Sequence, residues 1–296
     1  MILVDYLNVA TASIFKAMHT GHMDELSTTF LLGKIRTYNA EFRSEFGELV
    51  ICSDHRSWRK DEFEHYKARR VHSETPSQET QDLFRIRDEV YDALVAHSPY
   101  RCVKVPGAEG DDVMYQLSRH PGKHMIVSKD KDMSQLVSKR VRQWDPIKKQ
   151  EIDNGPGFLK RLIMHGDGGD DIPNFISDDD TFVNPSKRQR PITGRIRKFI
   201  AETIDPMVEF DYLKVKGVTS EQMRANWKRN EVLIDLKRTP RSILDSISDE
   251  FHRQQNKKGD LISLFTELRA GNFLSKSNDF VPNKTGVEAT HTQLDL

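Results

Sequence analysis

Short apolar runs alternate with longer amphipathic segments in the first half of the chain. The runs occupy residues 2–6, 49–54, 101–106, 124–130 and 141–145. Between them, apolar residues recur at helical spacing near residues 9–19, 26–46, 80–97, 110–119 and 131–137. Continuous apolar strands separated by helices indicate a mostly parallel sheet with helices on both faces. We therefore predict an α/β domain over residues 1–154.

The second half of the chain lacks strand patterns after about residue 155. Helical spacing predicts helices near residues 192–204, 206–216, 219–236, 240–255 and 259–271. We therefore expect a helical domain over residues 155–275. Residues 276–296 show no periodicity, and we expect a flexible tail there.

Composition narrows the class of protein only slightly. The 296 residues are enough for a buried core without disulfides, and the formal net charge is zero, so any affinity for nucleic acid must come from local clusters. Cys52 and Cys102 lie in apolar runs and indicate buried thiols in a reducing compartment. No signal peptide and no run of eighteen apolar residues is present, so we expect a cytoplasmic protein without a membrane span.

Carboxylates follow the ends of four predicted strands. Ligands of parallel α/β sheets gather beyond the carboxyl ends of the strands, so these side chains are expected at one edge of the sheet. A Gly-rich turn further along the chain adds three more acids. The candidates are Asp5, Asp54, Glu109, Asp111, Asp112, Asp130 and Asp132 at the sheet edge, and Asp167, Asp170 and Asp171 in the turn.

Each of these acids has a simpler interpretation as a helix cap or turn former, above all Asp112 and Asp171. Together, however, they would repel one another unless cations compensate them. The nearby Lys129 and Lys131 are expected to alternate away from the pair Asp130 and Asp132. Oxygen ligands without His or Cys suit two Mg²⁺ ions, with Mn²⁺ as a substitute, and two such ions favour phosphodiester hydrolysis.

Other enzyme classes fit less well. The sequence has no phosphate-binding loop of the G-x-x-x-x-G-K-[ST] type and no nucleophile elbow. A phosphatase with an aspartyl nucleophile would need one favoured Asp and a Lys rather than a dispersed ring of acids.

Two basic segments suit a polyanionic substrate. Residues 55–72 combine cations that can hold phosphates with aromatic rings that can stack on bases, although a solvated amphipathic helix would look similar. Residues 186–199 resemble a turn between helices that grips duplex phosphates through backbone N–H groups. Residues 72–81 are polar and indicate a mobile loop or arch. The candidate nucleic-acid contacts are Arg56, Trp58, Arg59, Tyr66, Lys67, Arg69, Arg70, Lys187, Arg188, Arg190, Arg195, Arg197 and Lys198.

Five motifs in order carry a resemblance to a known family. They are LVDYLN, then SD followed by WRK and YKARR, then EGDD, then SKDKDMSQL, and then GDGGDDIPN. This order resembles the structure-specific 5′-nucleases, the flap endonucleases and 5′-3′ exonucleases, and within them the bacteriophage T4 type of RNase H. The likeness extends through NEVLIDLKRTPRSI and SLFTELRAGNFLSK, so it covers nearly the whole chain.

The resemblance implies a PIN-like sheet with a helical arch over about residues 55–95, and a helix-three-turn-helix element that grips duplex DNA. It also implies two-metal cleavage that leaves 5′-phosphorylated products. Lys67 and Arg70 match arch cations that steer the scissile phosphate, and Tyr66 matches a stacking residue. The ligands of the first ion would be Asp5, Asp54, Glu109, Asp111, Asp112 and Asp130, and those of the second Asp132, Asp167 and Asp170.

Two residues and one segment depart from the pattern of that family. Gly110 stands in EGDD where Ala is common, and Asp171 stands where Asn is usual. NPSKRQRPITGRIRKF replaces the usual Gly-rich hairpin, which puts a bound monovalent ion in doubt. The last residues, Gln293–Leu296, look like a truncated sliding-clamp peptide, with an inert tail as the alternative.

Three functions remain in view from the sequence. The first is a monomeric Mg²⁺-dependent 5′ nuclease that removes RNA primers and adjacent DNA, with RNA:DNA and DNA duplexes bearing 5′ ends, forks or flaps as substrates. A replication clamp and a single-strand DNA-binding protein would be its partners. The second is an inactive structure-specific DNA-binding protein, and the third is a PIN-type endoribonuclease.

Overall fold

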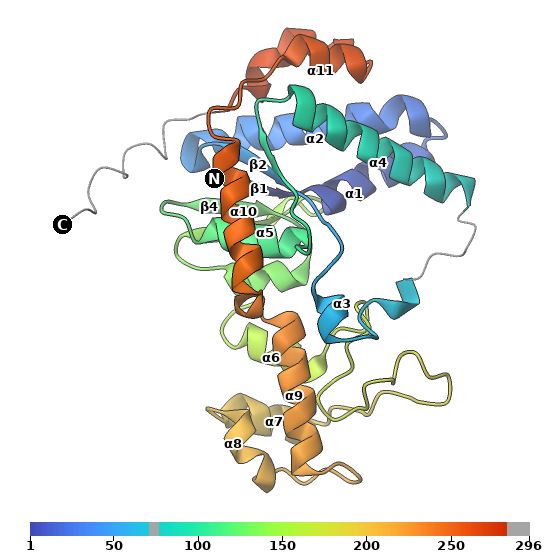
Figure 1. Cartoon of the computed structure of the whole chain (residues 1–296), viewed down its shortest axis with the longest axis vertical. Helices are drawn as coiled ribbons and strands as arrows, with labels where there is room; N and C mark the ends of the chain where they lie inside the picture. Colours follow the sequence, from blue (N-terminus) through green and yellow to red (C-terminus); the bar gives the residue numbers. More distant parts are fainter. Residues whose placement is uncertain (71–76, 283–296) are drawn as a thin grey trace, which may run out of the picture. The chain divides into compact units, whose positions relative to one another are not determined.

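The computed structural model describes residues 1–70 and 77–282 (Figure 1). These residues form two compact units. The first, which we call the sheet unit, contains Met1–Arg56, 77–153 and 241–282, and the second, the helical unit, contains residues 57–70 and 154–240. The sequence placed the division differently, because it assigned residues 241–275 to the helical domain.

The sheet unit is built on six strands in the order β3-β2-β1-β4-β5-β6. Every neighbouring pair is parallel except β5 and β6. The strands of the central part are fully buried, as expected for a parallel sheet covered on both faces. Their bounds are β1 Ile2–Asp5, β2 Leu49–Cys52, β3 Arg101–Val103, β4 His124–Val127, β5 Val141–Asp145 and β6 Gln150–Ile152.

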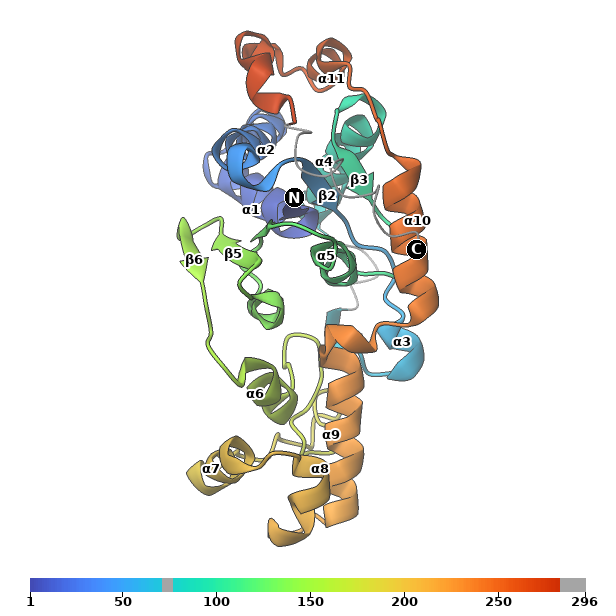
Figure 2. The same cartoon turned by 90° about the vertical axis from the view of Figure 1, so that its left-hand side faces the viewer.

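Helices cover both faces of this sheet. Ile2 and Val4 share one core with α1 (Tyr6–His19), α2 (Met23–Phe46) and α4 (Gln78–His97). The helix α5 (Gly110–Ser118) contacts β1 and β2 but contributes no side chain to that core, so it covers the opposite face. Figures 1 and 2 show α10 (Arg241–Arg253) beside α5, which it contacts together with β3.

The C-terminal part of the described chain belongs to the sheet core. Phe280, at the end of the 3₁₀ segment η5 (Gly271–Phe280), is fully buried with Phe265 of α11 (Leu261–Glu267). Asn39 of α2 donates to the carbonyl oxygens of Asp279 and Val281, at 2.7 and 3.0 Å. The predicted start of the tail at residue 276 is therefore too early. Widely spaced aromatic residues anchor this segment in the core although its sequence has no periodicity.

The edge strand β3 is covered by a side chain. The amide of Gln254, which follows α10, accepts a hydrogen bond from Cys102 N at 2.9 Å and donates to Cys102 O at 2.8 Å. One side-chain amide thus satisfies both backbone groups of Cys102 that face away from the sheet.

The helical unit packs around three aromatic rings. Phe175 stacks on Phe210 with ring centroids 5.3 Å apart, and Trp227 meets both rings edge-on or tilted at 5.6 and 5.7 Å. Its helices are α3 Arg59–Glu62, η1 Ala68–Arg70, α6 Phe158–His165, α7 Gly194–Glu202, α8 Pro206–Glu209, η3 Phe210–Tyr212, α9 Ser220–Ile234 and η4 Leu236–Arg238.

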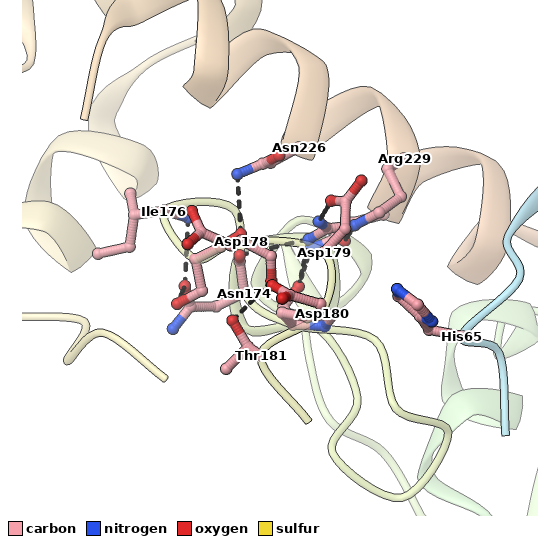
Figure 3. A network of polar contacts seen from close by, with 12 residues as sticks. His65, Asn174, Ile176, Asp178, Asp179, Asp180, Thr181, Asn226 and Arg229 are labelled. Atoms are coloured by element: carbon pink, nitrogen blue, oxygen red, sulfur yellow. Dashed lines mark hydrogen bonds and ion pairs between the residues drawn. The ribbon is translucent and has the colours of Figure 1, made fainter. Parts of the chain in front are cut away.

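A polar network ties the loop after Pro173 to α9 (Figure 3). Arg229 forms an ion pair with Asp179 and donates to the carbonyl oxygen of Pro173 at 2.7 Å. Asn226, one turn earlier on α9, donates to Ser177 O at 2.9 Å. This loop of irregular backbone is therefore held by side chains of one regular helix.

The fold class expected from the sequence is confirmed, since the sheet is mostly parallel and a helical region follows it. Details differ. Residues 131–136 form a 3₁₀ segment, η2, instead of an α-helix, and β6 was missed because its residues are mostly exposed and polar. Of the expected arch, residues 78–97 form α4, packed on the sheet core, and residues 71–76 lie outside the described part. In residues 1–70 and 77–282, no helix is long and apolar enough to cross a membrane.

The buried end of η5 makes a testable contribution to stability. We expect Phe280→Ala to lower the free energy of unfolding by about 3–5 kcal/mol, because it leaves a cavity in the core. Leu274→Ala, on the same segment but 53% exposed, serves as the control and should change it far less. Urea denaturation measures both variants, and equal losses would contradict the role of Phe280.

Candidate active site

Three candidate acids are placed by parallel strands. Asp5 is the last residue of β1, Asp54 lies two residues beyond β2, and Asp130 lies three residues beyond β4. Because β1 pairs in parallel with both β2 and β4, the three strands end at one edge. The sequence expectation for these acids follows directly from this topology.

Asp5 is held by groups from two segments. Its side chain is 8% exposed and accepts hydrogen bonds from Asn8 N at 3.0 Å and from the hydroxyl of Ser128 at 2.6 Å. The pKa of Asp5 is raised to about 7, chiefly by burial. The negative charge of Asp54 contributes more to this rise than that of Asp130 does. The two hydrogen bonds lower it, so the net rise shows how strongly burial and neighbouring carboxylates oppose the charge.

Asp111, on the first turn of α5, shows which acids gather here. Burial raises its pKa well above the usual range, and the charges of four further carboxylates add to the rise. In decreasing order these belong to Asp130, Asp5, Glu109 and Asp54. Acids from four separate segments of the sequence thus form one cluster, which we call the carboxylate cluster: Asp5, Asp54, Glu109, Asp111 and Asp130.

Gly110 places Asp54 within the cluster. Its backbone N–H donates to Asp54 Oδ1 at 3.2 Å. A Cβ at this position would lie 3.4 Å from Asp54 Oδ2, an ordinary van der Waals contact. An alanine at this position would therefore fit beside Asp54.

Ser128 and Gln143 position Asp130, and the sequence analysis missed both. The hydroxyl of Ser128 accepts from Asp130 N at 3.0 Å while donating to Asp5, so it links two acids. The buried amide of Gln143 on β5 donates to the carbonyl oxygens of Ser128 and Asp130 at 3.0 and 2.6 Å. Gln143 could have been predicted from the sequence, because a polar Gln stands at an inward position of an expected strand.

Asp112 and Asp132 have other partners. Asp112 is fully buried and accepts from Glu109 N at 3.0 Å, so it caps α5, which is the simpler interpretation that the sequence left open. Lys131 Nζ lies 3.2 Å from Asp132 Oδ1. The expectation that Lys131 points away is wrong, because η2 is helical and side chains do not alternate there as in a strand.

In the helical unit, Asp167 starts a tight turn. Gly166 ends α6 with a positive φ of 66°, and a Cβ there would lie 2.3 Å from the carbonyl oxygen of Ile172. Only glycine fits this approach. Asp167 Oδ1 then accepts from Gly169 N at 2.7 Å and closes the turn.

Residues 66–70 bind this turn through cations, an arrangement that we call the clasp. Asp170 accepts from the hydroxyl of Tyr66 at 3.1 Å and from Arg70 at 2.6 Å, and its Oδ2 lies 3.6 Å from Lys67 Nζ. Lys67 has a left-handed backbone, with φ 54°, and its N–H donates to Asp170 O at 2.9 Å. Such a backbone persists only where its surroundings hold it.

Arg69 pairs with the buried Asp171 at the centre of the clasp. Asp171 is 1% exposed, accepts from Arg69 N at 2.8 Å and forms an ion pair with its guanidinium. Arg69 also donates to Gly168 O at 2.6 Å and lies over the ring of Phe182. Asp171, which stands outside both expected ligand sets, uses its carboxylate in this ion pair.

Several residues expected to contact nucleic acid are buried in this structure. Trp58 and Tyr66 are among them, and stacking of their rings on bases stays a prediction. Arg59 is 3% exposed and donates to Leu233 O at 2.8 Å, so it is a structural residue. Phe63 and Tyr66 of this segment belong to the core of the helical unit, although their spacing among cations suggested contacts with bases. Arg56 remains exposed.

The second basic segment is partly neutralised within the helical unit. Lys187 pairs with Asp178 and Asp180 at 3.0 and 2.6 Å. Arg190 donates to the carbonyl oxygens of Lys216 and Gly217 at 3.2 and 3.3 Å. Arg195 donates to Lys214 O, Lys198 lies 3.9 Å from Glu202, and Arg188 and Arg197 are exposed.

The donor chemistry of the carboxylate cluster fits a hard divalent cation. Its ligands are oxygens, and the raised pKa values of Asp5 and Asp111 show charge that a dication would stabilise. In the described residues, however, no three His, Cys, Asp or Glu side chains stand ready to hold an ion.

Comparison with known proteins decides the family. The model of the 5′-3′ exonuclease N-terminal resolvase-like domain matches residues 1–161. The chain belongs to this family. The family resemblance expected from the sequence is thereby confirmed, whereas the likeness to the T4 type of RNase H stays a prediction.

Curated relatives match part of the chain. Flap endonuclease Xni of Shewanella baltica strain OS223 is 31% identical over 141 residues, which are 43% of this chain and 51% of that protein. A 5′-3′ exonuclease of Buchnera aphidicola subsp. Schizaphis graminum is 25% identical over 194 residues, 58% of this chain and 64% of the other. The chain thus spans about half to two thirds of the length of these relatives.

Solved structures share the fold. The T5 D15 protein co-crystallised with metal ions has a TM-score of 0.62 at 15% identity, covering 85% of this chain and 98% of the other. The T5 5′-exonuclease with bound zinc gives the same score and identity, covering 86% and 98%. At this identity the likeness establishes the mostly parallel sheet with its helical region.

The clasp makes a specific prediction for stability. Arg69→Met should lower the free energy of unfolding by about 1–3 kcal/mol, because it leaves the buried carboxylate of Asp171 without its half-exposed cation. Combining it with Asp171→Asn should cost less than the sum of the two single changes, since neutral Asn needs no cation. Denaturant unfolding of all four proteins measures the coupling, with Arg188→Met as an exposed control. Additive losses would contradict the pair.

Proposed function

We propose that this chain is a divalent-metal-dependent 5′ nuclease. It would act as a 5′-3′ exonuclease and flap endonuclease with RNase H activity, and would hydrolyse phosphodiester bonds of RNA primers and adjacent DNA during lagging-strand replication. The observation that carries the proposal is the carboxylate cluster, in which burial and the charges of four other acids raise the pKa of Asp111. The family match and the flap endonucleases among its relatives support the same reaction class.

The proposed cofactors are two Mg²⁺ ions, for which Mn²⁺ would substitute. The first ion would use Asp5, Asp54, Glu109, Asp111, Asp112 and Asp130, and the second Asp132, Asp167 and Asp170. Bound ions of this kind supply charge stabilisation at the attacking and leaving oxygens of a phosphodiester. The capping role of Asp112 places it at the periphery of the first set. Paired as they are, Asp132 and Asp170 would have to release their lysine and arginine partners.

The residues of the clasp suggest how a phosphate is recognised. Lys67 and Arg70 both address Asp170, so one anionic group already lies between two cations. We propose that a substrate phosphate takes the place of the Asp170 carboxylate against these cations. The carboxylate thereby becomes available as a ligand when substrate arrives, and Arg69 keeps the segment in place through Asp171.

DNA and RNA:DNA duplexes with 5′ ends, forks or flaps are the proposed substrates. Contacts to the duplex backbone would come from the exposed cations Arg56, Arg188 and Arg197, together with Lys198. The helix-three-turn-helix interpretation of residues 186–199 remains part of this proposal, and Thr193 caps its helix α7 through a hydrogen bond to Ile196 N. The proposed sliding-clamp peptide, Gln293–Leu296, lies outside the described residues, and the single-strand DNA-binding protein remains a proposed partner.

The test of the proposed function is cleavage of a labelled 5′-flap duplex and of an RNA primer on DNA, with and without Mg²⁺. We expect Asp130→Asn to reduce the cleavage rate by a factor of about a thousand or more, because it removes a charged oxygen from the cluster. Binding of the same duplex should persist, since less negative charge repels the phosphates. Glu267→Gln, at an exposed acid on α11, is the control. A normal rate in Asp130→Asn would remove the metal assignment.

The linking hydroxyl of Ser128 gives a second test. Ser128→Ala should weaken Mn²⁺ binding by about tenfold or more, because residues that orient metal ligands typically contribute this much to affinity. Ser118→Ala removes another buried hydroxyl, which donates to Tyr115 O, and should leave ion binding unchanged. Calorimetric titration with Mn²⁺ distinguishes the two. Equal affinity in both variants would show that Ser128 does not orient the ligands.

A further inference from the structure

A second site lies in a cavity of about 300 Å³ in the sheet unit. It opens between α1, α2 and the turn that joins β5 to β6, and it includes no member of the carboxylate cluster. Its volume is at the lower end of the range of small-molecule sites. Its lining includes Lys16, Phe30, Lys34, Tyr38, Pro146 and Ile147.

Lysine side chains bring positive charge to this cavity, while burial and then the nearby carboxylates of Glu41 and Asp145 raise the pKa of Tyr38 in its lining. Lys16 and Lys34 line it, and burial followed by the charges of Lys149 and Lys16 lowers the pKa of Lys34. Lys34 Nζ donates to the carbonyl oxygen of Pro146 at 3.3 Å. Across residues 1–70 and 77–282, none of these three lysines has a carboxylate partner. An anion in the cavity would supply that partner.

The turn that carries Lys149 is firmly built. Asp145 Oδ1 accepts from Ile147 N at 2.8 Å and from Lys148 N at 3.0 Å. Lys149 has a left-handed backbone, with φ 56°, and its N–H donates to Asp145 O at 2.9 Å. These bonds fix the backbone of the turn whose Pro146 and Ile147 line the cavity, and the charge of Lys149 in the same turn acts on Lys34.

One buried polar group at the cavity is unexplained by the protein itself. Tyr38 lines the cavity, and its hydroxyl is buried with no hydrogen-bond partner in the described part of the chain. A buried hydroxyl is usually paired, so this position is suited to a ligand or to a water that accompanies one.

The walls indicate what kind of anion fits. Phe30 offers an aromatic ring, with Lys16 Nζ 4.4 Å from its centre, and Ile147 is an exposed apolar side chain at the rim. We propose that this cavity binds a nucleotide, with its phosphate on Lys16, Lys34 and Lys149 and its base against Phe30 and Ile147. The choice of a nucleotide among anions rests on the proposed function, which brings nucleic acid to this unit.

Calorimetric titration tests the site in the full chain with EDTA present, so that the carboxylate cluster holds no ion. We expect 2′-deoxyadenosine 5′-monophosphate to bind more tightly than 2′-deoxyadenosine or inorganic phosphate. Lys34→Met should weaken its binding by about tenfold, the usual worth of a hydrogen bond to a charged group. Lys34→Arg should retain most of the affinity. Lys139→Met, at an exposed lysine outside the cavity, should not change it.

Two results would overturn the site. They are equal affinity for the monophosphate in Lys34→Met and the unaltered protein, or binding of the monophosphate no tighter than that of deoxyadenosine. Circular dichroism checks folding, and Lys16→Met, at an exposed side chain, repeats the test if Lys34→Met does not fold.

A final comparison identifies the source of the nucleotide. A 5′-phosphorylated pentadeoxyadenylate that binds more tightly than the monophosphate, and loses affinity in Lys34→Met, assigns the site to a nucleic-acid strand. Equal binding assigns it to a free nucleotide. Flap cleavage by the unaltered chain is measured separately, so absent cleavage with intact monophosphate binding would remove the nuclease proposal and leave the site.

Discussion

Repulsion among buried carboxylates is the constraint on which this structure depends. Parallel pairing of β1 with β2 and β4 brings Asp5, Asp54 and Asp130 to one edge, and α5 adds Glu109 and Asp111. Burial, followed by the charges of neighbouring carboxylates, raises the pKa values of Asp5 and Asp111. Hydrogen bonds from Ser128 and Asn8 offset only part of this cost. A fold that retains such a cluster is one in which a divalent cation can restore the balance.

The helical unit solves the same electrostatic problem in another way. Its acids Asp170 and Asp171 are matched by cations from residues 67–70, about a hundred positions earlier in the chain. Charge is therefore compensated by cations in the clasp, whereas at the sheet edge burial and neighbouring carboxylates raise the pKa values of Asp5 and Asp111. This contrast also separates the two roles of basic residues. Arg69 is committed to a buried carboxylate, while Arg70 and Lys67 share one that is still partly accessible.

Sequence reasoning reached the sheet and its acids because both follow from local rules. Apolar runs fix the strands, and parallel topology then places whatever follows each strand, so Asp5, Asp54 and Asp130 could be found without coordinates. The clasp could not be predicted, since nothing local in YKARR tells which distant carboxylate will meet each cation. Trp58 and Arg59 are ambiguous for a related reason: the same residues suit a base, a phosphate or a core, and only tertiary packing decides. Phe280 was missed because its burial depends on α2 and α11 rather than on its own neighbours.

The amide of Gln254 has a consequence for how copies of this protein coexist in solution. By occupying both outward backbone groups of Cys102, it removes from β3 the hydrogen bonds that a strand of another molecule would need in order to extend the sheet. Concentrated protein should therefore resist edge-to-edge association on that side. One side chain placed after a helix thus removes the free hydrogen-bonding groups of this sheet edge, as closure into a barrel removes the edges of a sheet.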